Sequence, residues 1–396
     1  MKSTLCYSAD FETTTDPNDC RVWAYALSNV ANPKEFHYGN SIQGFLEFCA
    51  NPKYNYTMLF FNLKFDGSFI ISELLQQGYV RIDAEDDKKT RTFNTLITDK
   101  GAFYAIEIYF EVKGHHTNKV KILDAMKLFP NFSVERLAES FGLEISKLEL
   151  DYREKRPIGH ELTPHEIEYI KNDVEIVAWA LKAMYDKGLT RMTIASNAIQ
   201  DFRTRYTHFK RSFPTLDPIV DSALRQSYKG GFTYLNPIYT AKEVGAGVTL
   251  DVNSLYPSIL KYERMPVGQA VYYDGEYQYD PHYPLYIQTI SCQFKLKAGK
   301  IPTIQIKHTM DFIGNEYLTS SGKNSITLTL TNVDLKLFYD HYEVIKPEYI
   351  CGWKFKASKH IFDSYIDYWT EEKITAGKEG NKGKRQIAKL MLNSLY

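Results

Sequence analysis

Short alternating runs of hydrophobic and polar residues mark the first part of the chain, and they predict a sheet accompanied by helices. Alternation with a period of two predicts strands over residues 4–11, 21–28, 56–61, 103–112 and 117–124. The last two strands form a predicted hairpin that turns at Gly114, His115 and His116. Strands that alternate with helices are typical of a mixed α/β layer domain.

Two helices in the same region are predicted from apolar spacing and from their first residues. One follows Asp66, since apolar side chains recur there at intervals of three and four residues. The other begins at Thr163, because a capping hydroxyl, Pro164 at the first helical position and Glu166 in the third form a capping box. This second helix is expected to continue towards Gly188.

Length, composition and charge define the general class of the protein. A chain of 396 residues, 44% hydrophobic and 24% charged, is long enough for two or three globular domains. Lysine plus arginine and aspartate plus glutamate both number 48, and this zero net charge is mild evidence against a nucleic-acid-binding protein. The five cysteines include no CxxC pair, so neither a disulfide framework nor a zinc site is expected. The first residues lack the apolar run of a signal peptide or membrane span, which favours the cytoplasm.

Three separate acidic motifs stand out in the first domain. Asp10 and Glu12 are alternate residues of a predicted strand, so their side chains project to the same side of the sheet. Asp66 lies at a turn from strand to helix. Tyr169 and Asp173 are four residues apart on the capped helix and therefore share one helix face.

The chemistry of these motifs matches phosphodiester hydrolysis. Two divalent ions about 4 Å apart activate a water and stabilise the leaving oxygen, and hard ions such as Mg²⁺ or Mn²⁺ bind carboxylate oxygens. Four carboxylates would hold them, and the hydroxyl of Tyr169 would orient the water. Taken singly, such motifs are more often a solvated acid pair, a turn or helix cap, or a pair on a helix surface. Their joint occurrence in this order favours a two-metal nuclease site.

The three motifs together resemble the exonuclease motifs of DnaQ-like proofreading domains. In that resemblance Asp10 and Glu12 form the first motif, Asp66 the second, and Tyr169 with Asp173 the third. The resemblance implies an RNase H-like fold and 3′–5′ exonuclease activity on DNA.

Three further motifs in the second half resemble those of family B DNA polymerases. Tyr228, Gly230 and Gly231 match the YxGG motif that links the exonuclease and polymerase regions. The run from Val248 to Ser258 matches motif A, with the signature SLYPS after its aspartate. The chain ends on a match to motif B, which begins at Lys389.

Motif A implies the more specific chemistry. Asp251, at the end of a predicted apolar strand, would bind both metals of nucleotidyl transfer with help from the Val252 carbonyl. Tyr256 would stack under the sugar of the incoming nucleotide.

Motif B implies a basic helix that binds the triphosphate. On that helix Lys389, Asn393 and Tyr396 would share one face, and Lys373 would assist from the preceding helix.

Nearly the whole chain therefore resembles the bacteriophage-type, protein-primed family B DNA polymerases. The resemblance implies that Lys147 and Tyr152 assist the exonuclease and that Asn62 and Phe65 grip a 3′ end. Further DNA contacts are implied for Tyr152, Tyr228, Gly230, Gly231 and Ser254. The implied partners are single-stranded and primer-template DNA, dNTPs and a terminal priming protein, with two Mg²⁺ or Mn²⁺ ions in each active site.

The same resemblance implies an α/β and α+β multidomain fold. An exonuclease domain would cover 1–190, and the start of the polymerase palm 191–260. Residues 261–360 would continue the palm with an insertion of the terminal-protein-region type that includes Ile301 to Lys307, and 361–396 would form fingers helices.

Motif C, which carries the second polymerase aspartate, is absent from the sequence, so we expect a chain truncated within motif B. Three functions stay open at this point. In the first, the chain is the first portion of a polymerase, and a second chain completes it with motif C and the thumb. In the second, it is a stand-alone 3′–5′ exonuclease. In the third, it is a catalytically silent fragment that binds DNA or a terminal protein.

Overall fold

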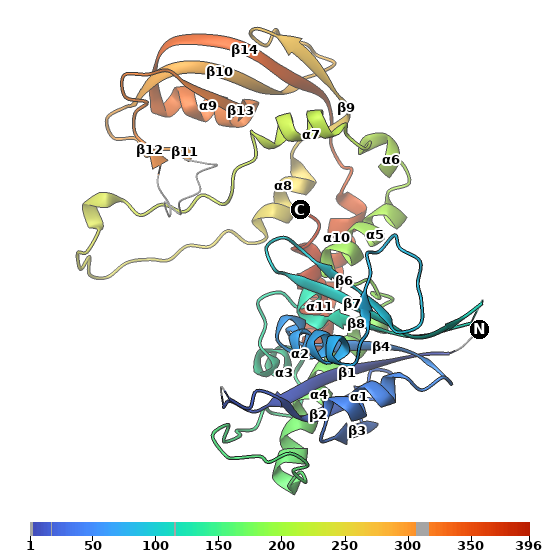
Figure 1. Cartoon of the computed structure of the whole chain (residues 1–396). Coiled ribbons are helices and arrows are strands. Elements are labelled where there is room, and N and C mark those ends of the chain that lie inside the picture. The colour runs from blue at the N-terminus through green and yellow to red at the C-terminus, as the bar shows by residue number, and fades with distance from the viewer. Residues whose placement is uncertain (1–2, 17, 115, 306–316) are drawn as a thin grey trace. The chain divides into compact units, whose positions relative to one another are not determined.

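The computed structural model describes residues 3–16, 18–114, 116–305 and 317–396 (Figure 1). The chain forms two compact units, one of residues 1–202 with 365–396 and one of residues 203–364. Within the described residues, no helix has the length and apolar character needed to cross a membrane.

The first unit is built on an eight-stranded sheet with the order β3-β2-β1-β4-β8-β7-β6-β5. Its strands are β1 (Thr4–Thr13), β2 (Val22–Asn29), β3 (Phe36–Gly39), β4 (Asn55–Phe60), β5 (Val80–Arg81), β6 (Thr92–Ile97), β7 (Phe103–Lys113) and β8 (His116–Asp124). β1 lies inside the sheet, antiparallel to β2 and parallel to β4, and β4 is parallel to β8. Both edges of β1 are therefore hydrogen-bonded.

Helices on the two faces of this sheet decide which way the β1 side chains point. The helices of the unit are α1 (Ile42–Cys49), α2 (Leu63–Gln76), η1 (Ala125–Lys127), α3 (Val134–Phe141), α4 (Pro164–Tyr185), α5 (Ile194–Arg205), α10 (Asp363–Lys378) and α11 (Lys382–Leu392). Ala9 and Phe11 enter a buried core with residues of α1 and α2. α4 packs against β1 and β2, and the intervening positions Asp10 and Glu12 lie near this helix.

The structure confirms the predicted strands of the first domain to within about two residues. It also confirms the second predicted helix as α4, and the side chains of Thr163 and Glu166 form the expected reciprocal capping box. The predicted turn includes His115, which lies outside the described residues. α2 begins at Leu63, before Asp66, because Asn62 adopts a left-handed conformation (φ 77°) that turns the chain from β4 into the helix.

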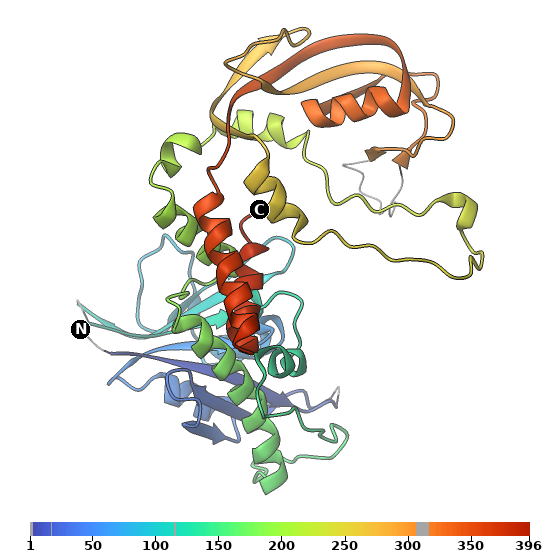
Figure 2. The same ribbon diagram turned by 180° about the vertical axis from the view of Figure 1, so that it is seen from behind.

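The last two helices belong to the first unit, and Figure 2 shows them beside α4. α11 contacts α3 and α4. On α10, the Trp369 indole donates to Asp201 Oδ2 (2.8 Å), and the Tyr365 hydroxyl donates to the carbonyl of Met391 on α11 (2.7 Å). The predicted domain boundaries are not decided by these contacts and stay predictions.

The predicted helix face shared by Lys389, Asn393 and Tyr396 is wrong, because α11 ends at Leu392 and Asn393 is its C-cap. Asparagine and serine compete with helical hydrogen bonds through their own side chains, and Ser394 Oγ donates to the Leu390 carbonyl (2.6 Å). Tyr396 therefore lies beyond the helix.

The second unit contains a four-stranded antiparallel sheet of order β13-β10-β14-β9. Its elements are α6 (Phe209–Ser212), α7 (Pro218–Arg225), η2 (Pro237–Tyr239), α8 (Leu255–Tyr262), β9 (Met265–Asp274), β10 (Leu285–Leu296), β11 (Ile304–Gln305), β12 (Tyr317–Leu318), β13 (Ile326–Thr331), α9 (Asn332–His341) and β14 (Tyr342–Ser358). α9 packs against this sheet, and Phe294, Phe338 and Tyr342 form the centre of its core. The end of the predicted segment Ile301 to Lys307 lies outside the described residues.

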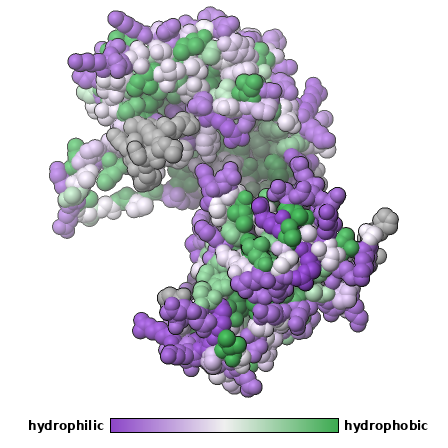
Figure 3. Space-filling view, viewed as in Figure 1, coloured by the Kyte–Doolittle hydropathy of each residue, from purple (hydrophilic) through white to green (hydrophobic). Residues whose placement is uncertain are grey.

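The segment before α8 departs from its prediction. We predicted an apolar strand ending at Asp251, but residues 240–254 contain no strand, and Val248, Leu250 and Val252 are 85%, 88% and 63% exposed. In both ribbon views the segment loops out from the sheet of its unit (Figures 1 and 2), and the projecting part of the surface carries hydrophobic residues among hydrophilic ones (Figure 3). An apolar strand requires hydrogen-bonded neighbours at its edges and packed side chains on its faces. No described strand pairs with residues 240–254.

Candidate functional site

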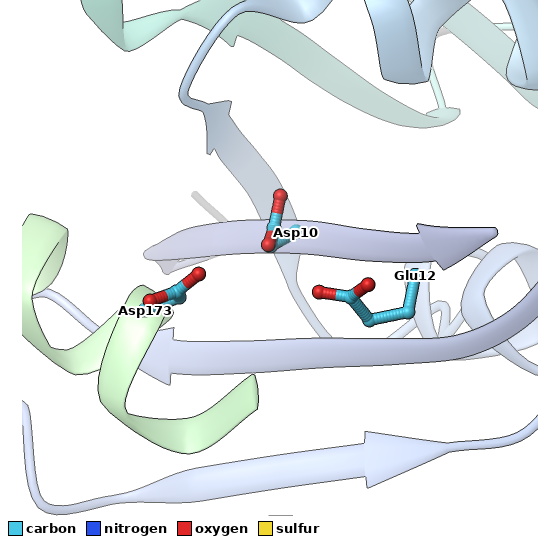
Figure 4. A group of neighbouring side chains, drawn as sticks. All are labelled: Asp10, Glu12 and Asp173. Atoms are coloured by element: carbon cyan, nitrogen blue, oxygen red, sulfur yellow. The ribbon is translucent and has the colours of Figure 1, made fainter. Parts of the chain in front are cut away.

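Three carboxyl groups from two elements meet in the first unit. Asp10 and Glu12 extend from β1 and Asp173 from α4, and Figure 4 shows the three carboxyls turned toward one another. Each has a carboxylate oxygen within 4.8 Å of the others. The strand alternation that buries Phe11 in the opposite core is what places Asp10 and Glu12 together.

Asp66, in the first turn of α2, lies next to this group but is not one of the three carboxyls within 4.8 Å of one another. Its side chain is 2% exposed, and its Oδ1 accepts a hydrogen bond from the backbone amide of Phe11, between Asp10 and Glu12 (3.2 Å). Burial, followed by the nearby charge of Asp10, raises the pKa of Asp66 well above its ordinary value. The four predicted carboxyl groups therefore lie in one buried region, with three of them within 4.8 Å of one another and Asp66 beside them.

The four acids are held in an environment that disfavours their charged forms. Burial and then the charge of Asp173 raise the pKa of Asp10 from 3.8 to about 7. Burial and then the charge of Asp10 raise the pKa of Glu12 from 4.5 to about 9. Burial also raises the pKa of Asp173. Such a cluster favours a cation as its partner, and strongly shifted acids are typical of functional sites.

Lys147 supplies one positive charge to the cluster. Its Nζ lies 3.1 Å from Asp173 Oδ2, and although burial lowers the pKa of this lysine, the Asp173 carboxylate raises it above its ordinary value. Asp173 Oδ1 is buried and has no hydrogen-bond partner among the described residues. The four carboxyl groups are thus accompanied by one ammonium group, and Asp173 Oδ1 is left without a partner among the described residues. Carboxylate oxygens are the ligands that hard divalent cations prefer.

A pair of tyrosines lies next to the acids. The hydroxyls of Tyr152 and Tyr169 are 2.6 Å apart, and Tyr169 is almost fully buried on α4. Burial and then the charge of Glu12 raise the pKa of Tyr169, so its hydroxyl stays protonated. The Thr15 hydroxyl donates to the Tyr152 carbonyl (3.0 Å) and links this loop to the end of β1.

A buried ion pair that the sequence did not indicate fixes the loop carrying Tyr152. Arg156 Nε lies 2.6 Å from Glu166 Oε1, and its guanidinium lies 4.4 Å from the centre of the Trp23 ring. Arg156 also donates to the carbonyls of Asp151 and Glu154. The capping box signalled Glu166 in the sequence, whereas Arg156 lies in a loop without periodicity and gave no signal.

Asp124, at the end of β8, is a second residue that sequence reasoning missed. Its Oδ1 accepts from the backbone amides of Asn62 (3.3 Å) and Leu63 (3.4 Å), and its Oδ2 pairs with Lys127 (3.2 Å). This carboxylate holds the left-handed turn at which α2 begins. Asn62 and Phe65, the residues predicted to grip a DNA end, are exposed on that turn beside Asp66.

The predicted polymerase residues are not assembled in the same way. Asp251 and Val252 lie on the exposed segment, Ser254 is the N-cap of α8 with a positive φ, and Tyr256 follows in its first turn. Tyr228, Gly230 and Gly231 are also exposed. The remaining predicted nucleotide-binding residues lie in the other compact unit: Lys373, Lys389, Asn393 and Tyr396. Among the described residues, no group of three metal-type ligands surrounds Asp251.

Comparison with known proteins relates this chain to polymerases. Residues 50–396 match the family described as DNA polymerase type B, organellar and viral. The chain is 44% identical to the DNA polymerase of Bacillus phage M2, over 98% of this chain and 67% of that protein. It is 30% identical to the DNA polymerase of Streptococcus phage Cp-1, over 99% of this chain and 69% of the relative.

Solved structures agree with this similarity. The fold matches Phi29 DNA polymerase with a TM-score of 0.93 and 43% identity, covering 99% of this chain and 67% of that one. It also matches Phi29 DNA polymerase complexed with single-stranded DNA, with a TM-score of 0.91 and 42% identity over the same shares of the two chains.

Proposed function

Because this chain belongs to the type B DNA polymerases of organelles and viruses, and among them to the protein-primed bacteriophage type, we propose that its first unit is a metal-dependent 3′–5′ exonuclease acting on DNA. The assembled group of Asp10, Glu12, Asp66 and Asp173 carries this proposal. The parallel pairing of β1 with β4, with α4 packed on β1, supports an RNase H-like fold for the unit.

The acidic site is suited to Mg²⁺ or Mn²⁺. Two such ions, held by the four carboxylates, would supply Lewis acidity toward the scissile phosphate and the attacking water. Lys147 neutralises part of the carboxylate charge and keeps the Asp173 side chain in place. The protonated Tyr169 hydroxyl, held by Tyr152, is placed to orient a water through a hydrogen bond.

The substrate is proposed to be the 3′ end of a DNA strand. Asn62 and Phe65 are exposed beside Asp66, and the phenyl ring of Phe65 is available to stack on an unpaired base. A solved structure of Phi29 DNA polymerase, which this chain resembles, is complexed with single-stranded DNA. This likeness supports a single-stranded 3′ end as the bound form.

The second unit is proposed to contribute part of a nucleotidyl-transfer site used in DNA replication. Asp251 and the Val252 carbonyl would bind metal there, and Tyr256 would bind the incoming dNTP. Lys373, Lys389, Asn393 and Tyr396 of the first unit stay proposed as dNTP-binding residues from their match to the motif. One carboxylate does not hold two ions between a primer oxygen and a triphosphate. We therefore expect no primer extension by this chain alone. A terminal protein is the proposed primer.

A stand-alone exonuclease is the second candidate. The segment that carries Asp251 is exposed, whereas Asp10, Glu12 and Asp173 are assembled within the first unit, and this difference favours the alternative. Adding dNTPs and primer-template to the chain, with and without a chain that carries motif C, separates the two: extension only with the second chain supports the split polymerase.

The exonuclease proposal is tested by degradation of a 5′-labelled single-stranded oligonucleotide with Mg²⁺, comparing the native chain with Asp66→Ala. We expect a ladder of products shortened from the 3′ end, and no ladder for the variant. Circular dichroism of both chains controls for folding, since Asp66 is buried at a helix start. A folded native chain that produces no ladder would leave the proposal without support.

A further inference from the structure

A basic pocket of about 540 Å³ lies in the second unit, at one end of the β9–β14 strand pair. The basic side chains in its lining are Arg264, His282, Lys356 and Lys359. Two prolines, Ala357 and Ser358 complete the lining, and no carboxylate takes part. We call this the β9–β14 basic pocket. None of the residues predicted from the polymerase motifs belongs to it.

Strand pairing brings two of the cations together from distant parts of the sequence. Ser358 at the end of β14 pairs with Met265 at the start of β9. Arg264 precedes β9 and Lys359 follows β14, so the register places these residues at the same end of the pair. Their proximity is therefore fixed by backbone hydrogen bonds and is independent of side-chain rotamers.

The loop that carries His282 is also held in place. The Tyr277 hydroxyl donates to the Tyr283 carbonyl (2.8 Å) and accepts from the Asp280 amide (3.1 Å). The Tyr277 ring stacks on Tyr286 of β10, with ring centres 3.8 Å apart. The loop that carries His282 is thus held in place without a ligand.

Asp280, the sequence neighbour of the lining residue Pro281, is already paired with a lysine. Asp280 pairs with Lys354 at 2.7 Å, and this hydrogen bond lowers the pKa of the carboxyl group. Lys354 and Lys356 both lie over the face of the Tyr283 ring, at 5.1 and 5.9 Å from its centre. No described carboxylate forms an ion pair with Lys356 or with the two other permanent cations, Arg264 and Lys359.

We propose that the β9–β14 basic pocket binds the phosphodiester backbone of DNA. Several cations around a hollow without a carboxylate repel one another unless an anion joins them. The whole chain has a formal net charge of zero, so this concentration of positive charge is local. Prolines and small side chains line the pocket between the cations, and this favours contact with phosphates over stacking on bases.

The choice of DNA as the polyanion rests on the proposed function, since the chain belongs to a family of DNA polymerases. The pocket adds a sequence-independent grip in the second unit to the 3′-end grip proposed for the first. Its removal is expected to weaken DNA binding without changing the acidic site.

The test is fluorescence anisotropy of a labelled DNA hairpin in EDTA, which prevents cleavage, over a series of salt concentrations. Lys356→Gln/Lys359→Gln is compared with Lys323→Gln/Lys336→Gln, which removes the same charge from exposed positions elsewhere in the unit. We expect the pocket variant to lose roughly tenfold in affinity at 0.1 M salt and about two units of the slope of log K against log salt. The control variant should retain the native slope.

Each contrary outcome is distinct. A native slope in the pocket variant, or an equal loss in both variants, would overturn the pocket as a DNA site. Free dNTP and unlabelled DNA are each used to displace the labelled hairpin. If dNTP displaces it at a concentration far below the DNA phosphate concentration that does so, the ligand is a triphosphate and the backbone proposal is overturned. A native chain that binds no DNA would overturn the proposed function together with the pocket.

Discussion

The acidic site of the first unit and the motif A segment of the second both match catalytic motifs in sequence, yet only the first is a formed site. Asp66 and Asp173 are buried among partners, whereas Leu250 and Val252, on either side of Asp251, are 88% and 63% exposed. The difference is not in the motif residues. β1 is hydrogen-bonded to strands on both edges, and no described strand pairs with residues 248–252.

This contrast shows what a catalytic motif needs from the rest of the fold. Alternation along β1 commits Ala9 and Phe11 to a core, and that burial fixes where Asp10 and Glu12 point. Apolar residues beside Asp251 have no core to enter within the described structure. A motif can therefore be complete in sequence while its side chains are not yet positioned for chemistry.

The largest expected effect comes from removing one carboxylate in each region. Asp173→Asn should lower 3′–5′ exonuclease turnover on the order of 1000-fold, since it removes a proposed metal ligand and the partner of Lys147. Asp251→Asn is the matched control and should leave turnover unchanged. Rates are measured on a 5′-labelled single-stranded oligonucleotide with Mg²⁺. A comparable loss of turnover in both variants would contradict the difference between the two regions.

The buried ion pair beside the acidic site gives the next effect. Arg156→Met leaves Glu166 Oε1 buried without its guanidinium partner, while Oε2 keeps its bonds to Thr163 and His160, and should cost about 3 kcal/mol of unfolding free energy in urea titrations. Arg153→Met, an exposed neighbour in the same loop, should cost less than about 0.5 kcal/mol.

Arg156→Met also tests whether Arg156 acts on catalysis through the pair of Tyr152 and Tyr169. If Arg156 acts on catalysis by positioning Tyr152, Arg156→Met should slow the exonuclease much less in a Tyr152→Phe background than in the native one. Equal slowing in both backgrounds would show that Arg156 affects catalysis by a route other than the Tyr152 hydroxyl, and no slowing in either would show that it serves stability alone.

The shifted acids predict how stability depends on pH without metal. The pKa of Asp10 rises from 3.8 to about 7 and that of Glu12 from 4.5 to about 9. A raised pKa means that the folded state holds protons which the unfolded state has lost, so this contribution is present at low pH and disappears as pH rises from about 4 to about 9.

We therefore expect the Tm in EDTA to fall by a few degrees from these two groups over that window, and Mg²⁺ to restore it at high pH. Glu12→Gln should flatten the profile, because it removes the group that titrates highest. Differential scanning fluorimetry across pH checks this. A profile that is identical in Glu12→Gln and in the native chain would contradict the assignment.

Much of the first site could be predicted from local patterns. Period-two alternation placed Asp10 and Glu12 on one side of a strand, and helical spacing placed Tyr169 and Asp173 on one face. The capping box located the start of α4 to the residue. These signals are short-range, and each depends only on neighbours along the chain.

The remainder depended on contacts between distant segments. Asp124 and Arg156 act through backbone groups and a buried partner that only the folded chain brings near. The strand at Asp251 was predicted from apolar residues alone, although a strand also needs a partner edge. The end of α11 at Leu392 was missed because the motif suggested one helix face, while Asn393 and Ser394 favour a cap.

The smallest expected effect is the change in unfolding free energy when a side chain of the exposed segment beside Asp251 is shortened. Leu250→Ala should change the unfolding free energy by less than about 0.5 kcal/mol, because its side chain is 88% exposed and leaves no cavity. Leu59→Ala on β4, where the side chain is 1% exposed, should cost about 2–5 kcal/mol in the same urea titration. A cost above about 1 kcal/mol for Leu250→Ala would mean that this leucine is packed in solution, against a second copy or within its own unit. The two regions would then differ less in burial than the structure shows, and the strand predicted before Asp251 would regain support.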